Sequence, residues 1–171
     1  MKTANNIDSL AKDFLAQKRI AVAGVSRKRE DAANLIYRKL RSAGYSVFAV
    51  NPNAATFDGD PCYPDLKSIP EKVDGVIVIT KPIHTEQVVR ECIELGIPRV
   101  WMHCSLGSKP RFAKELAAKI TSASEEVVQL CRENHITVIP GGCPMMFCEP
   151  VDFGHKCMHG LLRLTGSLNL N

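Results

Sequence analysis

Residues 19–28 read RIAVAGVSRK, and residues 44–52 read GYSVFAVNP. Each stretch contains an apolar run of the length of a buried strand, and the amphipathic segment from Asp31 to Ala43 lies between them, with Gly44 where a helix would end. Such a strand–helix–strand unit presents backbone N–H groups at its first turn, where the helix dipole also favours anions. The stretch therefore predicts an α/β fold with a phosphate site beside Gly24.

Apolar runs and amphipathic segments continue to alternate along the chain. We expect strands at 73–79, 98–102 and 136–139, and helices at 6–17, 82–95, 109–134 (in two pieces) and 152–165. The glycine- and proline-rich residues 53–70 are expected to form a loop. This order predicts a Rossmann-like, doubly wound, mainly parallel sheet of about five strands with helices on both faces. We expect a single domain over residues 1–171, with its core at about 15–147 and a C-terminal helical extension at about 150–166.

Composition narrows the class of protein. The 171 residues are 45% hydrophobic and 23% charged, as in ordinary globular proteins, and the net charge of +4 suits a small anionic ligand or a nucleic acid equally. Nothing resembles a signal peptide or an apolar membrane span, and the seven cysteines are an odd number. We therefore expect a cytoplasmic protein with reduced thiols, a small-molecule ligand, and neither a nucleic-acid nor a membrane partner.

The first turn differs from the best-known nucleotide fingerprints. Ser26 and Arg29 replace the later glycines of the Gly-x-Gly-x-x-Gly motif, and Asn51 stands where an acidic residue would hold a ribose. A P-loop motif is also absent from the sequence. A small nucleotide-dependent oxidoreductase is thus disfavoured, although it stays open as an alternative function.

Several motifs occur together in one order, and the combination is more specific than any of them. They are Gly24-Val25-Ser26-Arg27, Gly44-Tyr45 with Asn51-Pro52, Gly59 with Tyr63, Ile69-Pro70 with Val73-Asp74, and Gly141-Gly142-Cys143-Pro144-Met145. Over residues 15–147 this pattern resembles the single-domain CoA-binding protein family, which is similar to the CoA-binding domain of the succinyl-CoA ligase α-subunit. The resemblance implies non-catalytic binding of coenzyme A or an acyl-CoA. Because the ligase's phosphohistidine lies in a further domain, we expect no ligase activity and favour a protein that is not an enzyme.

The resemblance also implies where the ligand lies. The turn at Gly24, Val25 and Ser26 would meet the CoA phosphates through backbone amides, with Arg27, Lys28 or Lys81 adding positive charge. The remaining expected contacts are at strand ends: Asn51, Pro52 and Asn53 after the second strand, Thr80, Lys81 and Pro82 after the third, and Cys143 and Pro144 toward the thiol end of CoA. We further expect Gly24 to allow close approach of the ligand, and Cys143 to be able to form a mixed disulfide with it.

Cysteine and histidine are dense near the C-terminus, at Cys143, Cys148, His155, Cys157 and His159. Thiolate and imidazole together suit zinc, but no Cys-x-x-Cys pair is present, and Cys157 would point away from His155 and His159 on a helix. Buried thiols are the favoured interpretation. No metal is therefore expected, and a metal- or redox-responsive protein remains an alternative.

Overall fold

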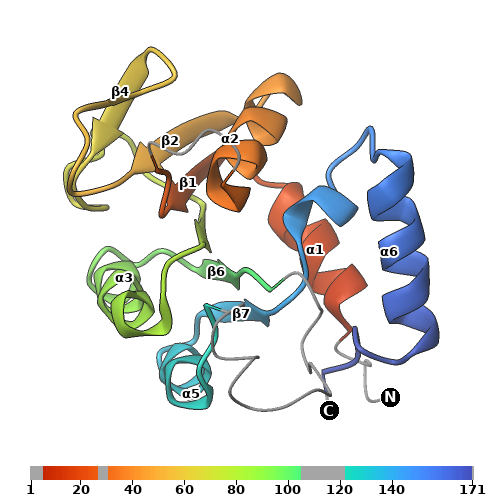
Figure 1. The fold of residues 1–171 in the computed structure, drawn as a ribbon. Helices are drawn as coiled ribbons and strands as arrows, with labels where there is room; N and C mark the ends of the chain where they lie inside the picture. Colours follow the sequence, from red (N-terminus) through yellow and green to blue (C-terminus); the bar gives the residue numbers. More distant parts are fainter. Residues whose placement is uncertain (1–5, 27–30, 105–121, 171) are drawn as a thin grey trace.

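The computed structural model describes residues 6–26, 31–104 and 122–170. These residues form a sheet with the strand order β3-β4-β2-β1-β5-β6-β7, flanked by helices (Figure 1). The strands are β1 (Arg19–Ala23), β2 (Ser46–Val50), β3 (Thr56–Phe57), β4 (Asp60–Tyr63), β5 (Gly75–Val78), β6 (Arg99–Met102) and β7 (Thr137–Pro140). The helices are α1 (Ile7–Leu15), α2 (Ala32–Ser42), α3 (Pro82–Glu94), α5 (Glu125–Glu133) and α6 (Phe153–Leu164), with a short 3-10 helix η1 (Pro144–Met146).

The strand order confirms the predicted doubly wound fold. All neighbouring strands from β4 to β7 pair in parallel, and only β3 is antiparallel to its neighbour. The chain moves outward from β1 to β2 and β4, then returns to pair β5 with the opposite edge of β1. At such a switch point the connections leave β1 and its neighbour in opposite directions, and a crevice opens at their carboxyl ends.

The number of strands differs from the prediction of about five. Residues 53–70, expected to form a loop, contain the two short strands β3 and β4. Asp58 and Gly59 join these strands, both with positive φ (49° and 86°), as a two-residue hairpin turn requires. The first helical piece expected within 109–134 falls largely outside the described residues, and the second is α5.

The central strands β1, β5 and β6 are buried on both faces, which explains their nearly continuous apolar sequences. Ile20 and Val22 of β1 pack in a cluster with side chains of α1 and α2, whereas Ala21 and Ala23 pack in a second cluster with α3 and α5. Figure 1 shows α1 and α6 on the opposite side of the sheet from α3 and α5. Because successive strand residues point to opposite faces, a single five-residue strand anchors both layers.

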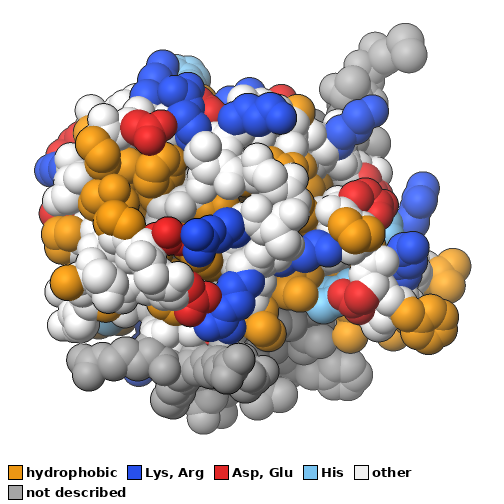
Figure 2. Space-filling view, turned by 90° about the horizontal axis from the view of Figure 1, so that it is seen from above, with side chains coloured by type: hydrophobic (Ala, Val, Ile, Leu, Met, Phe, Trp, Pro, Cys, Tyr) orange, Lys and Arg blue, Asp and Glu red, His pale blue; other side chains and the backbone are white. Residues whose placement is uncertain are grey.

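Helix α6 lies at the edge of the fold and buries little. Leu162 is its only buried residue, while Phe153 and Leu164 are 82% and 88% exposed. His159 Nε2 lies 2.7 Å from Asp8 Oδ1 and joins α6 to α1. In the view of Figure 2, hydrophobic side chains gather at the right-hand edge of the molecule, where α6 lies. Among the described helices, none is both long and apolar enough to cross a bilayer.

Gly24 ends β1 at the switch point and contacts both neighbouring strands. Its N–H donates to the carbonyl oxygen of Val50 on the β2 side, at 3.0 Å. A Cβ atom placed on it would lie 2.5 Å from the carbonyl oxygen of Ile79, the residue after β5. Gly24 also has a φ of +110°, which residues with a side chain rarely adopt. Both the backbone conformation and the contact with Ile79 therefore exclude a side chain at this position. The glycine is thus required by the fold before any ligand is considered.

We expect Gly24→Ala to lower the free energy of unfolding by about 3 kcal/mol or more, because it combines backbone strain with a clash against immobile backbone. Gly44→Ala is the matched control, since Gly44 has φ +88° but no atom within 4 Å of its Cβ position, and should cost about 1 kcal/mol. Urea unfolding curves of both variants measure the difference. Equal losses in the two variants would show that the contact with Ile79 is unimportant.

Candidate functional site

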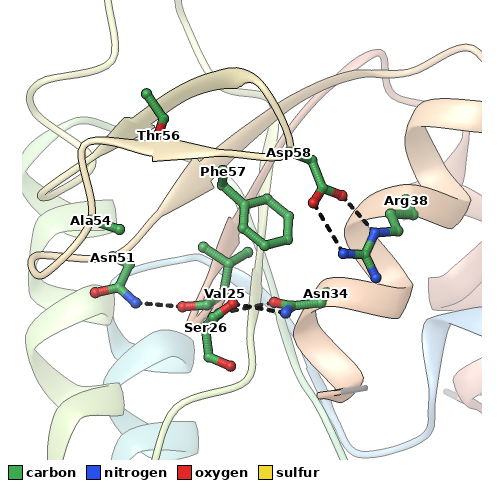
Figure 3. Close-up of a pocket in the computed structure, with 9 residues that line it drawn as sticks. All are labelled: Val25, Ser26, Asn34, Arg38, Asn51, Ala54, Thr56, Phe57 and Asp58. Atoms are coloured by element: carbon green, nitrogen blue, oxygen red, sulfur yellow. Dashed lines mark hydrogen bonds and ion pairs between the residues drawn. The ribbon is translucent and has the colours of Figure 1, made fainter. Parts of the chain in front are cut away.

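A cavity of about 550 Å³ opens beside the carboxyl end of β1 (Figure 3). Four segments supply its walls: the turn after β1, helix α2, the end of β2 and the β3–β4 hairpin. The lining residues are Val25, Ser26, Asn34, Arg38, Asn51, Ala54, Thr56, Phe57 and Asp58. The predicted residues Val25, Ser26 and Asn51 are therefore brought together in one cavity at the switch point.

Two asparagines fix the turn after β1. Asn34 Oδ1 accepts from the Ser26 N–H at 2.9 Å, and Asn34 Nδ2 donates to the Ser26 carbonyl oxygen at 2.8 Å. From the other side, Asn51 Nδ2 donates to the carbonyl oxygen of Val25. Asn34 is 1% exposed, so its amide serves as an internal clamp between α2 and the turn.

This clamp changes the expected use of the backbone amides. From the sequence, the Ser26 N–H was expected to bind a phosphate. In the structure this N–H donates a hydrogen bond to Asn34 Oδ1. The Ser26 hydroxyl contacts the carboxylate of Asp31, the residue at the N-cap position of α2. An anion at this helix end would thus lie close to a carboxylate, which opposes the favourable helix dipole. Arg27 and Lys28, predicted to add positive charge, lie outside the described residues.

The end of β2 contributes one of its three predicted residues. Asn51 lines the cavity, and its Oδ1 accepts from the Asn53 N–H at 2.8 Å. Pro52 and Asn53 are exposed and are not among the lining residues. Asn51 therefore stabilises both the turn it begins and the turn after β1.

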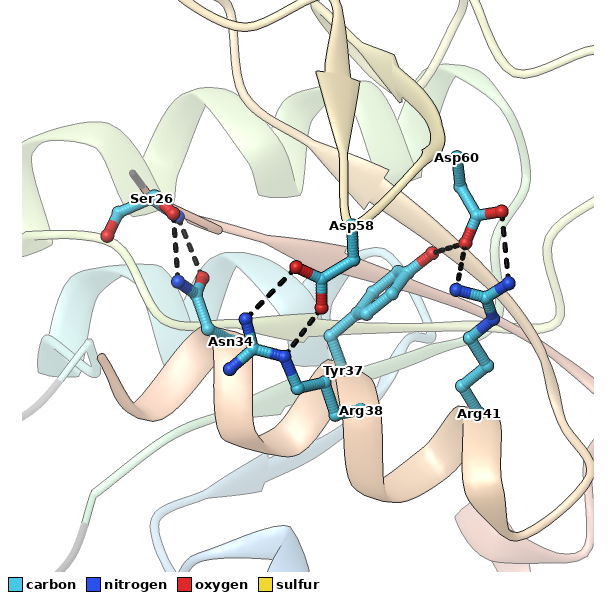
Figure 4. A network of polar contacts seen from close by, with 7 residues as sticks. All are labelled: Ser26, Asn34, Tyr37, Arg38, Arg41, Asp58 and Asp60. Carbon is cyan, nitrogen blue, oxygen red and sulfur yellow. Dashed lines mark hydrogen bonds and ion pairs between the residues drawn. The ribbon is translucent and has the colours of Figure 1, made fainter. Parts of the chain in front are cut away.

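Helix α2 is joined to the β3–β4 hairpin by two parallel ion pairs (Figure 4). Arg38 binds Asp58 with both prongs of its guanidinium, Nε to Oδ2 at 2.5 Å and Nη2 to Oδ1 at 3.0 Å. One helical turn further on, Arg41 pairs with Asp60 at 2.5 Å. Tyr37 also donates to Asp60 at 2.8 Å, and burial together with this bond raises the pKa of the Tyr37 hydroxyl. Only the Arg38–Asp58 pair lines the cavity among these contacts.

The segment after β5 occupies a neighbouring position. Lys81 occupies the N-cap position of α3, and Pro82 is the first residue of that helix. Thr80 bonds the Thr85 hydroxyl at 3.0 Å, and its carbonyl oxygen accepts from Ser122 at 2.7 Å. These three predicted residues lie at the same edge of the sheet as Gly24, but the cavity's lining does not include them.

The Cys143–Pro144 loop lies at the end of β7, three strands away from β1. Trp101 Nε1 donates to the carbonyl oxygens of Gly141 and Gly142, at 2.9 and 3.2 Å, and holds this loop against the sheet. Cys143 is 9% exposed, and burial raises the pKa of its thiol to about 11. A thiol in this state carries little thiolate, which opposes the mixed disulfide expected from the sequence.

The dense C-terminal cysteines and histidines do not converge. Cys148 is buried, whereas Cys157 is exposed on α6. His155 bonds Asp152 on its own helix turn, and His159 bonds Asp8 of α1. In the described part of the chain, no group of three or more His, Cys, Asp or Glu residues is placed to hold a metal ion.

Sequence reasoning missed six lining residues: Asn34, Arg38, Ala54, Thr56, Phe57 and Asp58. Four of them lie in the segment that was expected to be a loop. The dipeptide Asp58-Gly59 between Thr-Phe and Asp-Pro-Cys-Tyr is a hairpin signal that could have revealed β3 and β4. Asn34 and Arg38 carried no signal beyond their place on α2.

Comparison with known proteins identifies the family. Residues 18–149 match a family model described as the CoA binding domain. The chain belongs to this CoA-binding family. The matched residues run from just before β1 to just after η1 and contain every described lining residue of the cavity, whereas α6 follows them.

Relatives of this CoA-binding domain include both small proteins and parts of large enzymes. The chain is 37% identical over 75 residues to the ADP-forming acetate–CoA ligase I of Archaeoglobus fulgidus. These aligned residues make up 44% of this chain but only 11% of the ligase. A hypothetical protein from Pyrococcus horikoshii OT3 has a TM-score of 0.72 at 26% identity, over 88% of this chain and 96% of that one. The dinucleotide-forming acetyl-coenzyme A synthetase 1 of Ca. Korarchaeum cryptofilum has a TM-score of 0.56 at 26% identity, over 71% of this chain and 25% of that one.

Cys157 should react with a disulfide reagent much faster than Cys143. With the pKa of Cys143 at about 11, roughly one molecule in a thousand carries its thiolate at pH 8, and the sulfur is also shielded. Stopped-flow labelling should show a fast phase that Cys157→Ser removes and Cys143→Ser retains. A fast phase that is lost with Cys143→Ser instead would restore the reactive Cys143 expected from the sequence.

Proposed function

We propose that this protein binds coenzyme A or an acyl-CoA, without catalysing a reaction, in the cavity between α2, the end of β2 and the β3–β4 hairpin. The main support is the family match, because residues 18–149 contain all the described residues that line the cavity. The relatives named for acetate–CoA ligase and acetyl-coenzyme A synthetase use CoA as part of much longer chains. Binding is the property that the shared segment would carry.

The cavity's chemistry suits a nucleotide. Its volume of about 550 Å³ lies within the range of small-molecule sites. Val25, Ala54 and Phe57 give it an apolar side that can receive a base. Ser26, Asn34 and Asn51 provide hydroxyl and amide groups, and Arg38 provides a guanidinium. The cavity therefore offers both apolar and polar surface, as a ligand with an aromatic base and phosphates requires.

The length of CoA allows one ligand to reach several strand ends. Adjacent strands lie about 4.8 Å apart, so the end of β7 is about 14 Å from that of β1. With the adenosine end in the cavity, the thiol-ended arm could pass Thr80 and Lys81 after β5 and approach Cys143 and Pro144 after β7. We propose this path for the predicted residues that do not line the cavity.

We propose binding without catalysis because of the ionisable residues that line the cavity. Of the cavity residues that the structure describes, the ionisable ones are Arg38 and Asp58, and these two pair with each other. An acid–base reaction would need a group that holds or releases a proton near neutral pH. A carboxylate bound to a guanidinium is held in its charged form instead.

Ala54→Glu should abolish CoA binding, because it places a carboxylate in the half-buried wall of the cavity, where it takes up space and repels phosphate. Ala55→Glu is the matched control, since Ala55 is exposed, does not line the cavity, and keeps its backbone bond to Cys62. At a CoA concentration about 100 times Kd, binding should raise the Tm of the wild type and of Ala55→Glu by roughly 5 °C or more.

The thermal-shift series should include CoA, acetyl-CoA, NAD and ATP. Shifts with CoA or acetyl-CoA at concentrations where NAD gives none are expected. Wild-type protein whose Tm does not respond to CoA or acetyl-CoA at millimolar concentration would refute the proposed function. A shift that survives in Ala54→Glu would place the CoA site elsewhere on the chain.

A further inference from the structure

The two ion pairs between α2 and the β3–β4 hairpin are chemically alike but differ in position. Arg38–Asp58 lines the cavity, whereas Arg41–Asp60 lies one helical turn further along α2 and outside the lining (Figures 3 and 4). Both arginines would serve equally to fasten the hairpin to α2. Only one of them can also meet a ligand in the cavity.

We propose that Arg38 recognises the 3′-phosphate on the ribose of CoA, and that Asp58 takes the place of this phosphate in the ligand-free protein. This inference rests on the proposed function, since it assigns one group of the proposed ligand to one side chain. CoA differs from most adenine nucleotides in carrying that phosphate, so the contact would select CoA and acyl-CoA over dephospho-CoA.

The geometry around Arg38 fits this assignment. Its guanidinium carbon lies 5.7 Å from the centroid of the Phe57 ring, so the planar group is held over the cavity's aromatic wall. Its two-pronged contact with Asp58 presents the fork that suits phosphate oxygens as well as carboxylate oxygens. A dianionic phosphate attracts the guanidinium more strongly than a single carboxylate does.

Asp58 is placed where it can be displaced. It is the first residue of the two-residue turn at the tip of the hairpin, and its side chain is 31% exposed. The hairpin strands beside it are only two and four residues long. The Arg41–Asp60 pair and the Tyr37 bond to Asp60 would keep the base of the hairpin on α2 while its tip moves.

The test compares CoA with dephospho-CoA by calorimetry in the wild type and in Arg38→Gln, Asp58→Asn, the double variant and Arg41→Gln. Gln replaces the guanidinium by an uncharged polar amide on a shorter stem. Asn retains the backbone conformation with positive φ at position 58, because Asn-Gly is itself a favoured hairpin turn. Arg41→Gln removes the matching ion pair that lies outside the cavity.

We expect the wild type to bind CoA at least about 10-fold more tightly than dephospho-CoA. The double variant should lose this preference, with its affinity for dephospho-CoA changed by less than about threefold, because it removes both charges. Asp58→Asn alone should strengthen CoA binding, since it removes a carboxylate that competes with the phosphate for Arg38 and repels it. Arg41→Gln should keep the wild-type preference.

The outcomes separate this inference from the proposed function. If the wild type binds both ligands equally, or if the double variant keeps the preference for CoA, CoA binding stands and the role of Arg38 is refuted. If Asp58→Asn weakens both ligands alike, Asp58 contacts the ribose instead and the inference again fails. If the wild type binds neither ligand, the proposed function itself fails.

Discussion

The close passage of Gly24 between two strands is the constraint on which the site depends. Its N–H bonds Val50 at the end of β2, and its Cα faces the carbonyl oxygen of Ile79 at the end of β5. These neighbours belong to the two halves of the sheet, which the chain builds in opposite directions from β1. A side chain at this point would push the end of β1 away from the backbone that follows β5. The cavity beside Val25 and Ser26 exists because the backbone can turn here without a Cβ.

The parts of the fold that follow from local pattern were predictable from the sequence. The apolar run 19–23, the helix ending at Gly44 and the run 46–50 each carry their own signal, and parallel pairing follows from their order. Strands β3 and β4 were not predicted, because strands of two and four residues are too short to show periodicity, and Pro61 interrupts β4. Their existence depends on pairing with β2 and on the Asp58–Gly59 turn.

The site was predictable only where strand ends define it. Val25, Ser26 and Asn51 come together because parallel neighbours end at one edge of the sheet. Arg38 and Asp58 are 20 residues apart on a helix face and a hairpin tip, and only the packing of β4 beside β2 brings them into contact. The same topology explains why Thr80 and Cys143 do not line the cavity. Their strands are the first and third neighbours of β1 on the side away from β2.

The balance of charge in the described crevice limits how tightly an anion can bind. The helix dipole of α2 contributes about half a positive charge at its N-terminus, but Asp31 stands at that end and contacts Ser26. The positive charge of Arg38 is matched by Asp58. Described groups alone therefore give the cavity no excess of positive charge, and a phosphate that binds Arg38 would have to displace existing bonds. In the binding proposed above, each bond within the protein that the phosphate displaces subtracts from the free energy gained by its new contacts.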